Sequence, residues 1–158
     1  MLTTEQVYAA FYDEYVKLNA FLHSHSFTGN PLACAAALAS LDVFENEHTI
    51  ERLQPKIALL QEILGEIEAM PGVAEVRGRG FMAGIDLGEH DQALRMGHRV
   101  TLEARERGAI IRPLSDVVVL MPPLSISESD LRRLLEITRE SIEVACAAAA
   151  PAPLAQAA

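Results

Sequence analysis

The sequence predicts an α+β fold, in which helices precede a small antiparallel sheet that is covered on one face by helices. Two observations lead to this class. Apolar residues recur at helical spacing up to about residue 69, whereas the remainder alternates short strand-like runs with helical ones in the order ββαββα. Strands joined in this way form an antiparallel sheet that buries one face against a helical layer.

Five helices are expected from apolar spacing and from the residues at their ends. The second ends before a polar break at residues 45–48, Pro55 kinks or divides the third, and Gly108 ends the fourth. Ser127 and Asp130 resemble a capping box that opens the last helix. The expected helices cover residues 4–18 (one short helix or a single turn), 31–46, 50–69, 91–107 and 127–146. The apolar stripe of the last contains Leu131, Leu134 or Leu135, Ile137 and Val144.

Four short strands are expected between these helices, at Val73–Arg77, Phe81–Leu87, Ala109–Arg112 and Val117–Met121. Gly78-Arg79-Gly80 is expected to turn between the first two strands, with solvated arginines rather than a ligand site. Pro113–Asp116 connects the last two strands. Met121-Pro122-Pro123 ends the final strand and forms a wall beside Arg112.

Composition excludes several classes of function. The 158 residues carry a formal net charge of −9, which argues against binding to nucleic acid or to an anionic membrane. Cys34 and Cys146 are isolated and are expected to be reduced. Without an apolar run near 18 residues or a signal segment, the expected location is the cytoplasm.

The run from His23 to Ala37 is a hydroxyl-rich loop that enters a helix of small residues. Asn30 is a good N-cap, Pro31 suits the first helical turn, and Ser26 lies just before them. A helix N-terminus with nearby hydroxyls suits a phosphate group, although an ordinary capped helix explains the same spacing. Because no acidic residue or cysteine stands at ligand spacing from the histidines, a metal site is not expected.

Two separated motifs resemble class III, fold-type-I aminotransferases, which depend on pyridoxal phosphate. The run 23–34 is similar to that family's His-Gly/Ser-x-Ser/Thr-[FY]-x-Gly-Asn-Pro-Leu-Ala-Cys segment. Ile111–Leu124 and the opening residues 2–12 resemble the branch that aminates 8-amino-7-oxononanoate in biotin biosynthesis. The resemblance extends to about Cys146 and implies the C-terminal third of such an enzyme.

The resemblance also implies a division of the chain. Residues 1–48 would be the end of the large domain, with the phosphate loop and the start of a linking helix. Residues 49–146 would be the small α+β domain, and the Ala/Pro-rich residues 147–158 a disordered tail.

Site residues are carried over by match to the motifs. Ser26, with the backbone of His25, would bind the phosphate of pyridoxal phosphate in the partner subunit of a homodimer. Ser24 would touch substrate through its main chain. Arg112 would bind the carboxylate of 8-amino-7-oxononanoate, with S-adenosylmethionine as the usual amino donor; without the resemblance, Arg112 would be read as a surface arginine in a salt bridge.

No catalytic residue is expected within this chain. Its two lysines, Lys17 and Lys56, lie outside the family's context for the Schiff-base lysine, so the chain alone is expected to be inactive. Two alternatives stay open. One is another class III enzyme that acts on an ω-amino acid or ornithine, and the other is a non-catalytic α+β binding module.

Overall fold

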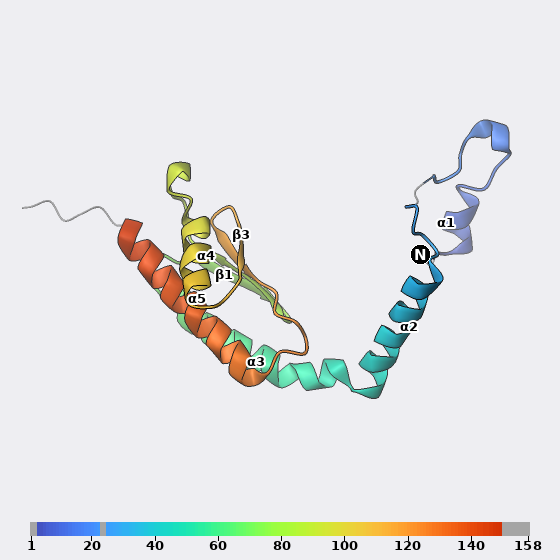
Figure 1. Ribbon diagram of the computed structural model, residues 1–158. Coiled ribbons are helices and arrows are strands. Elements are labelled where there is room, and N and C mark those ends of the chain that lie inside the picture. The colour runs from blue at the N-terminus through green and yellow to red at the C-terminus, as the bar shows by residue number, and fades with distance from the viewer. Residues whose placement is uncertain (1–2, 23–24, 150–158) are drawn as a thin grey trace, which may run out of the picture. The chain divides into compact units, whose positions relative to one another are not determined.

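The computed structural model describes residues 3–22 and 25–149 (Figure 1). The chain divides into two compact units, Met1–Val43 and Phe44–Ala158, and each is described by itself. Helices and a small antiparallel sheet make up the fold, which confirms the α+β class. The division at residue 48 that the resemblance implies stays a prediction.

The first unit is built of short helical segments joined by polar loops. Helix α1 spans Glu5–Ala9, and the side chain of Thr4 caps it by accepting from the backbone nitrogen of Val7 at 3.4 Å. The 3₁₀ turn η1 spans Tyr15–Lys17. Helix α2 spans Pro31–Asn46, as expected, and none of its residues is buried.

Helix α3 spans Thr49–Glu68 without interruption, although Pro55 was expected to kink or divide it. Pro55 removes the backbone donor that would otherwise reach the carbonyl oxygen of Glu51, one turn earlier. Tertiary packing of one face keeps the helix continuous, through the buried side chains of Leu53, Leu59, Leu60, Leu64 and Ile67.

The four strands of the second unit form one antiparallel sheet in the order β1-β2-β4-β3. The strands are β1 (Glu75–Arg79), β2 (Met82–Asp86), β3 (Arg112–Leu114) and β4 (Val117–Leu120). The turn was expected at Gly78-Arg79-Gly80, but the first two of these residues belong to strand β1. Gly78 pairs with Ala83, and Arg79 pairs with Met82, so the chain reverses at Gly80 and Phe81.

Alternate residues of the central strands point into the core. Ala83, Ile85, Val118 and Leu120 are buried, whereas their neighbours along the strands are less covered. Their register agrees, because Ala83 faces Leu120 and Ile85 faces Val118. Residues directly opposite each other share a sheet face, so this face carries the hydrophobic core and the other does not.

Strand β3 begins at Arg112, not at Ala109 as expected, and contains Pro113. A proline is tolerated here because β3 is an edge strand that needs donors on one side only. The hairpin to β4 uses two residues, Ser115 and Asp116, and Ser115 has a φ of 54°. Positive φ at the first turn residue is typical of a tight type II′ connection.

Helix α5 contacts both α3 and α4, α3 also contacts β1, and α4 also contacts β3 and β4 (Figure 1). The expected helix over 91–107 is a 3₁₀ turn, η2 (Gln92–Leu94), followed by α4 (Met96–Glu106). Gly108 follows α4 with a φ of 92°, as expected for a helix terminator.

Helix α5 spans Glu128–Ala149. Its expected cap is confirmed, since Ser127 Oγ accepts from the backbone nitrogen of Asp130 at 3.0 Å. The apolar stripe differs at its end, because Val144 is exposed and Ile142 is fully buried. The helix also includes residues 147–149, which were expected to belong to the tail; the rest of that tail lies outside the described residues.

Candidate functional site

A cavity of 310 Å³ lies at the end of the sheet where β3 begins and β4 ends. Arg112 is the one charged residue among its lining residues. The remainder of the lining is apolar: Ile110, Ile111, Val119, Leu120, Met121, Pro122, Pro123 and Leu134. The two sequence motifs, Ile-Arg-Pro and Met-Pro-Pro, therefore meet at one site, as the expected wall beside Arg112 requires.

Strand pairing determines which way Arg112 faces. It pairs with Val119 of β4, so both side chains lie on the same face of the sheet. Val118 and Leu120 point to the opposite face and are buried in the core. Arg112 is consequently exposed and lies on the sheet face that the helices leave open.

The Met121-Pro122-Pro123 segment ends the strand ladder and forms one wall of the cavity. Strand β4 stops at Leu120, directly before this segment. Prolines cannot donate to a ladder and have a restricted φ. They hold the wall in place without introducing a polar group that would compete for Arg112.

The charge of Arg112 is not compensated within the described part of the chain, where its guanidinium has no hydrogen bond or ion pair. Three other arginines of the described residues, Arg52, Arg77 and Arg107, do form ion pairs. Arg77 contacts Glu75 at 2.7 Å, and Arg107 contacts Glu103 at 2.7 Å, a hydrogen bond that raises the pKa of Arg107. A permanent cation beside an apolar cavity suits a ligand with a carboxylate at the end of an alkyl chain.

The loop before α2 contains two consecutive β-turns. The backbone nitrogen of Thr28 donates to the carbonyl of His25 at 2.9 Å, and that of Asn30 donates to Phe27 at 3.1 Å. Gly29 is the third residue of the second turn, and its φ of 77° suits glycine at that place. The hydroxyl of Thr28 accepts from the backbone nitrogen of His25 at 3.0 Å and so supports the loop.

Ser26 lies at the first of these turns, and its side chain is exposed. Its hydroxyl, and the backbone N–H groups of Ser26, Phe27 and Gly29, have no hydrogen-bond partner in residues 3–22 and 25–149. The ring of His25 stacks on Phe27, with centroids 5.1 Å apart. These donors fit an anionic group such as a phosphate.

The N-terminus of α2 itself does not offer the free donors that the sequence predicted. The Oδ1 of Asn30 accepts from the backbone nitrogens of Leu32 at 3.0 Å and Ala33 at 3.2 Å, and its carbonyl accepts from Cys34 at 3.0 Å. Pro31 has no N–H. The cap that the sequence predicted is therefore present, and it occupies the donors that a phosphate would need.

The predicted site residues fall into three places. His25 and Ser26 belong to the unit Met1–Val43, whereas Arg112 belongs to the unit Phe44–Ala158. Ser24 lies outside the described residues. The sequence analysis did not identify Ile110, Val119 and Leu134 as cavity residues. The expected connection at 113–116 would place Arg112 opposite Val117, whereas the shorter turn pairs it with Val119.

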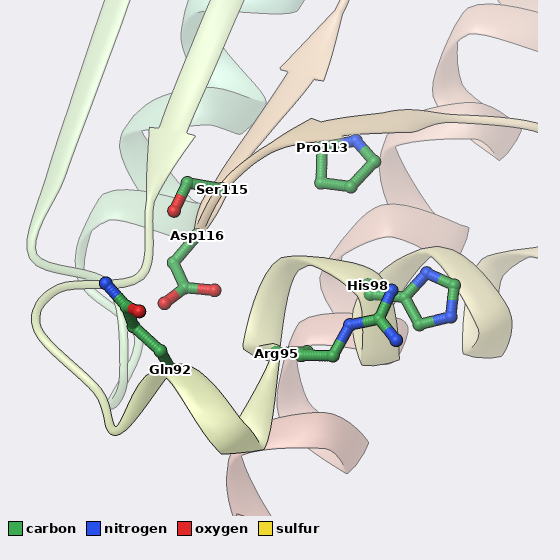
Figure 2. A pocket seen from close by; sticks show the side chains of 6 residues that line it. All are labelled: Gln92, Arg95, His98, Pro113, Ser115 and Asp116. Carbon is green, nitrogen blue, oxygen red and sulfur yellow. The ribbon is translucent and has the colours of Figure 1, made fainter.

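A second cavity, of 460 Å³, lies between the start of α4 and the β3–β4 hairpin (Figure 2). It is polar, with Arg95 and His98 on the helix side and the carboxylate of Asp116 directed toward the start of α4. Asp116 Oδ1 accepts from the backbone nitrogen of Gly97 at 3.1 Å. That carboxylate already accepts a hydrogen bond from the first turn of α4. The polar groups around this cavity therefore hold the hairpin against the helix.

The described residues contain no group of three or more histidine, cysteine, aspartate or glutamate side chains placed to hold a metal ion. None of their helices combines the length and apolar character needed to cross a membrane.

Comparison with known proteins identifies the family of the chain. Residues 1–142 match the family model described as aminotransferase class-III. The chain is 49% identical over 148 residues to an adenosylmethionine-8-amino-7-oxononanoate aminotransferase of Nitratidesulfovibrio vulgaris, covering 89% of this chain and 27% of that protein. An enzyme of the same name from Aquifex aeolicus is 44% identical, covering 90% of this chain and 33% of that protein.

Other class members are also similar. The mitochondrial ornithine aminotransferase of Arabidopsis thaliana is 36% identical over 125 residues, covering 77% of this chain and 26% of that enzyme. The crystal structure of the adenosylmethionine-8-amino-7-oxononanoate aminotransferase of Methanocaldococcus jannaschii superposes with a TM-score of 0.81 at 38% identity, covering 90% of this chain and 34% of that one. The chain thus spans about a third of the length of its relatives. It belongs to the class III aminotransferase family.

Proposed function

We propose that this chain supplies part of the active site of an aminotransferase that converts 8-amino-7-oxononanoate to 7,8-diaminononanoate, with S-adenosylmethionine as donor. The names of the relatives from Nitratidesulfovibrio and Aquifex support this substrate. The observation that carries the proposal is the position of Arg112, an unpaired cation at the mouth of an apolar cavity.

Arg112 binds the carboxylate of the substrate. A guanidinium can donate two parallel hydrogen bonds to a carboxylate, which orients the ligand as well as attracting it. The apolar lining accepts methylene groups behind the carboxylate and keeps water from competing for the ion pair. The reacting carbonyl, at the far end of the chain, is then held at a constant distance from Arg112.

Ser26 binds the phosphate of pyridoxal phosphate through its hydroxyl, in a homodimer where the cofactor belongs to the partner subunit. The unpaired N–H groups of the turn at Ser26–Gly29 add further donors. A Vibrio fluvialis aminotransferase, crystallised in a form named as PMP-bound, matches 85% of this chain with a TM-score of 0.77 at 27% identity. When bound, the cofactor supplies the electron sink and carries the amino group.

The chain alone does not transaminate, because neither of its lysines is placed to hold the cofactor. Lys17 is on the surface and contacts Asp13 at 2.8 Å. Lys56 donates to the carbonyl oxygen of Leu124 at 3.1 Å. The remaining two thirds of the enzyme would have to supply the reactive lysine.

A hybrid enzyme tests the proposal. The 148 matching residues of the Nitratidesulfovibrio relative are replaced by this chain, and amination of 8-amino-7-oxononanoate is measured with S-adenosylmethionine and pyridoxal phosphate. We expect turnover by the hybrid and none by the 158-residue chain alone. A folded hybrid that binds the cofactor yet does not turn over this substrate contradicts the proposal.

The second candidate is an aminotransferase for ornithine or another ω-amino acid, favoured by the similarity to the Arabidopsis enzyme. The same hybrid separates the two. Ornithine and β-alanine are offered as amino donors with a 2-oxo acid as acceptor, in the absence of S-adenosylmethionine. Faster turnover of either pair than of S-adenosylmethionine with 8-amino-7-oxononanoate supports this second reading.

A further inference from the structure

Two large apolar side chains line the cavity beside Arg112. Ile110 precedes β3 and is 87% exposed, and Met121 follows β4 and is 66% exposed. The ladder pairs Arg112 with Val119. Continuing that register by two residues places Ile110 opposite Met121 on the same face, in agreement with the lining of one cavity by both.

Such a pair differs from ordinary exposed hydrophobic residues. A single apolar side chain in water is common on protein surfaces. Here two of them flank an uncompensated cation at the rim of a cavity. One side of that cavity is held in place by the core, because Ile111 and Leu134 pack against the buried residues Ala104, Ala109 and Ile137.

We propose that Ile110 and Met121 are specificity-determining residues, which hold the methylene groups next to the carboxylate on Arg112 and so select an unbranched alkyl acid. The inference rests on the proposed function and adds the basis of chain-length selection. Met121 is unbranched and flexible, so it can close over a straight chain. Ile110 is branched and stiff, and it leaves little room for a substituent near the carboxylate.

The cavity volume of 310 Å³ lies at the lower end of the range for small-molecule sites, about 300–1,000 Å³. It therefore accommodates a short alkyl segment. A fully buried methylene strengthens binding about fourfold, and one held at a half-open rim about twofold. Affinity should rise with chain length by a factor in this range and then level off once the alkyl chain leaves the cavity.

Ligand-observed saturation-transfer NMR on the full 158-residue chain tests the inference. The probes are pentanoate, heptanoate and nonanoate, with a branched eight-carbon acid and hexylamine as comparisons. The variants are Ile110→Ala, Met121→Ala and Arg112→Gln, with Leu102→Ala as the matched control. Leu102 is 45% exposed on α4 and does not line the cavity. Circular dichroism of each variant checks that the fold is kept.

We expect dissociation constants to fall about twofold to fourfold per methylene for the straight acids, and the branched acid and the amine to bind at least tenfold more weakly than heptanoate. Ile110→Ala and Met121→Ala should remove most of the length dependence, while Leu102→Ala leaves it unchanged. If carboxylates bind through Arg112 but both alanine variants keep the full length dependence, the inference is wrong and the proposed function stands. If no acid binds and Arg112→Gln changes nothing, the carboxylate role of Arg112 fails, and the inference with it.

Discussion

The Oδ1 atom of Asp116 lies 3.1 Å from the backbone nitrogen of Gly97, and this hydrogen bond joins the β3–β4 hairpin to the first turn of α4. The N-cap residue of α4, Arg95, provides no side-chain acceptor. Asp116 supplies one from a distance of 19 residues in the sequence. The joint fixes the hairpin whose first strand begins with Arg112.

Position 97 has no room for a side chain, because the β3–β4 hairpin packs directly against it. A Cβ atom there would collide with the carbonyl oxygen of Ser115 and would lie 2.9 Å from the Cβ of Pro113. Gly97→Ala should lower the free energy of unfolding by about 1–3 kcal/mol, since the hairpin must move. Gly65→Ala is the control, because a Cβ there meets nothing within 4 Å, and it should raise stability by about 0.5–1 kcal/mol. Urea titrations of both variants that show equal stability would contradict this packing.

The carboxylate at position 116 acts as an acceptor rather than through its charge alone. Asp116→Ala should cost about 0.5–2 kcal/mol, the usual value of a lost helix cap. Asp116→Asn keeps an oxygen acceptor and should recover most of the loss. Thermal denaturation of the two variants compares them directly; an asparagine variant as unstable as the alanine one would show that charge is what matters.

The two cysteines should differ in reactivity. Cys34 is exposed on α2, whereas Cys146 is half-buried and its Sγ lies 3.9 Å from the carbonyl oxygen of Gly72. Burial raises the pKa of the Cys146 thiol, so less of the reactive thiolate forms there. Alkylation at about pH 8, followed by mass spectrometry, should label Cys34 at least tenfold faster. Equal rates would contradict the packing of α5 on the loop at Gly72.

The same shift affects stability at alkaline pH. Because the folded-state pKa of Cys146 is raised, its contribution to stability is present below the unfolded pKa and is lost as the pH rises through the folded value. Stability of the natural chain should therefore decline more above about pH 9 than that of Cys146→Ala. The measurement is the urea midpoint of both proteins as a function of pH. If the two midpoints fall in parallel as the pH rises, the pKa of Cys146 is not raised.

The chain should associate with itself. Leu38 is 63% exposed and Leu41 is 64% exposed, and the two lie three residues apart on α2, so they share a face. Patches of this kind mark interaction surfaces. Light scattering should give a mass that rises with concentration, and Leu38→Glu with Leu41→Glu should lower it. A constant monomer mass at tens of micromolar would contradict the expectation.

Local signals in the sequence predicted much of the fold correctly. The caps at Asn30 and Ser127 depend on residues within one turn, and both form as expected. The strand expected at Phe81–Leu87 forms as β2, one residue shorter at each end. These features involve neighbouring residues, so sequence periodicity contains them.

The errors arise where pairing or packing overrides local preference. Gly78 and Arg79 are typical of a turn, yet cross-strand hydrogen bonds to β2 keep them in β1. In α5 the core side follows Leu135, Thr138 and Ile142, a spacing that leaves Val144 exposed. The link between Asp116 and Gly97 spans 19 residues and has no signature in the sequence.

The candidate site was predictable in part, because two motifs each carried one side of it. Ile-Arg-Pro and Met-Pro-Pro were expected to lie beside each other, and both line the cavity at Arg112. The apolar cavity residues Leu134 of α5, Ile110 before β3 and Val119 of β4 were missed, since they depend on how strand and helix pack. The polar loop at Ser26 and the cap at Asn30 were predicted, but the two β-turns of that loop follow only from the geometry.

The most direct test of the central claim is the effect of Arg112→Gln on the hybrid enzyme, measured with 8-amino-7-oxononanoate and with its methyl ester. Loss of a charged hydrogen-bonding pair costs about 1.5–3 kcal/mol, which corresponds to a roughly tenfold to hundredfold fall in kcat/KM. We predict that fall for the free acid, little change for the ester, and no comparable effect of Arg79→Gln. An equal loss for acid and ester, or none for either, would contradict the assignment of Arg112 to the substrate carboxylate.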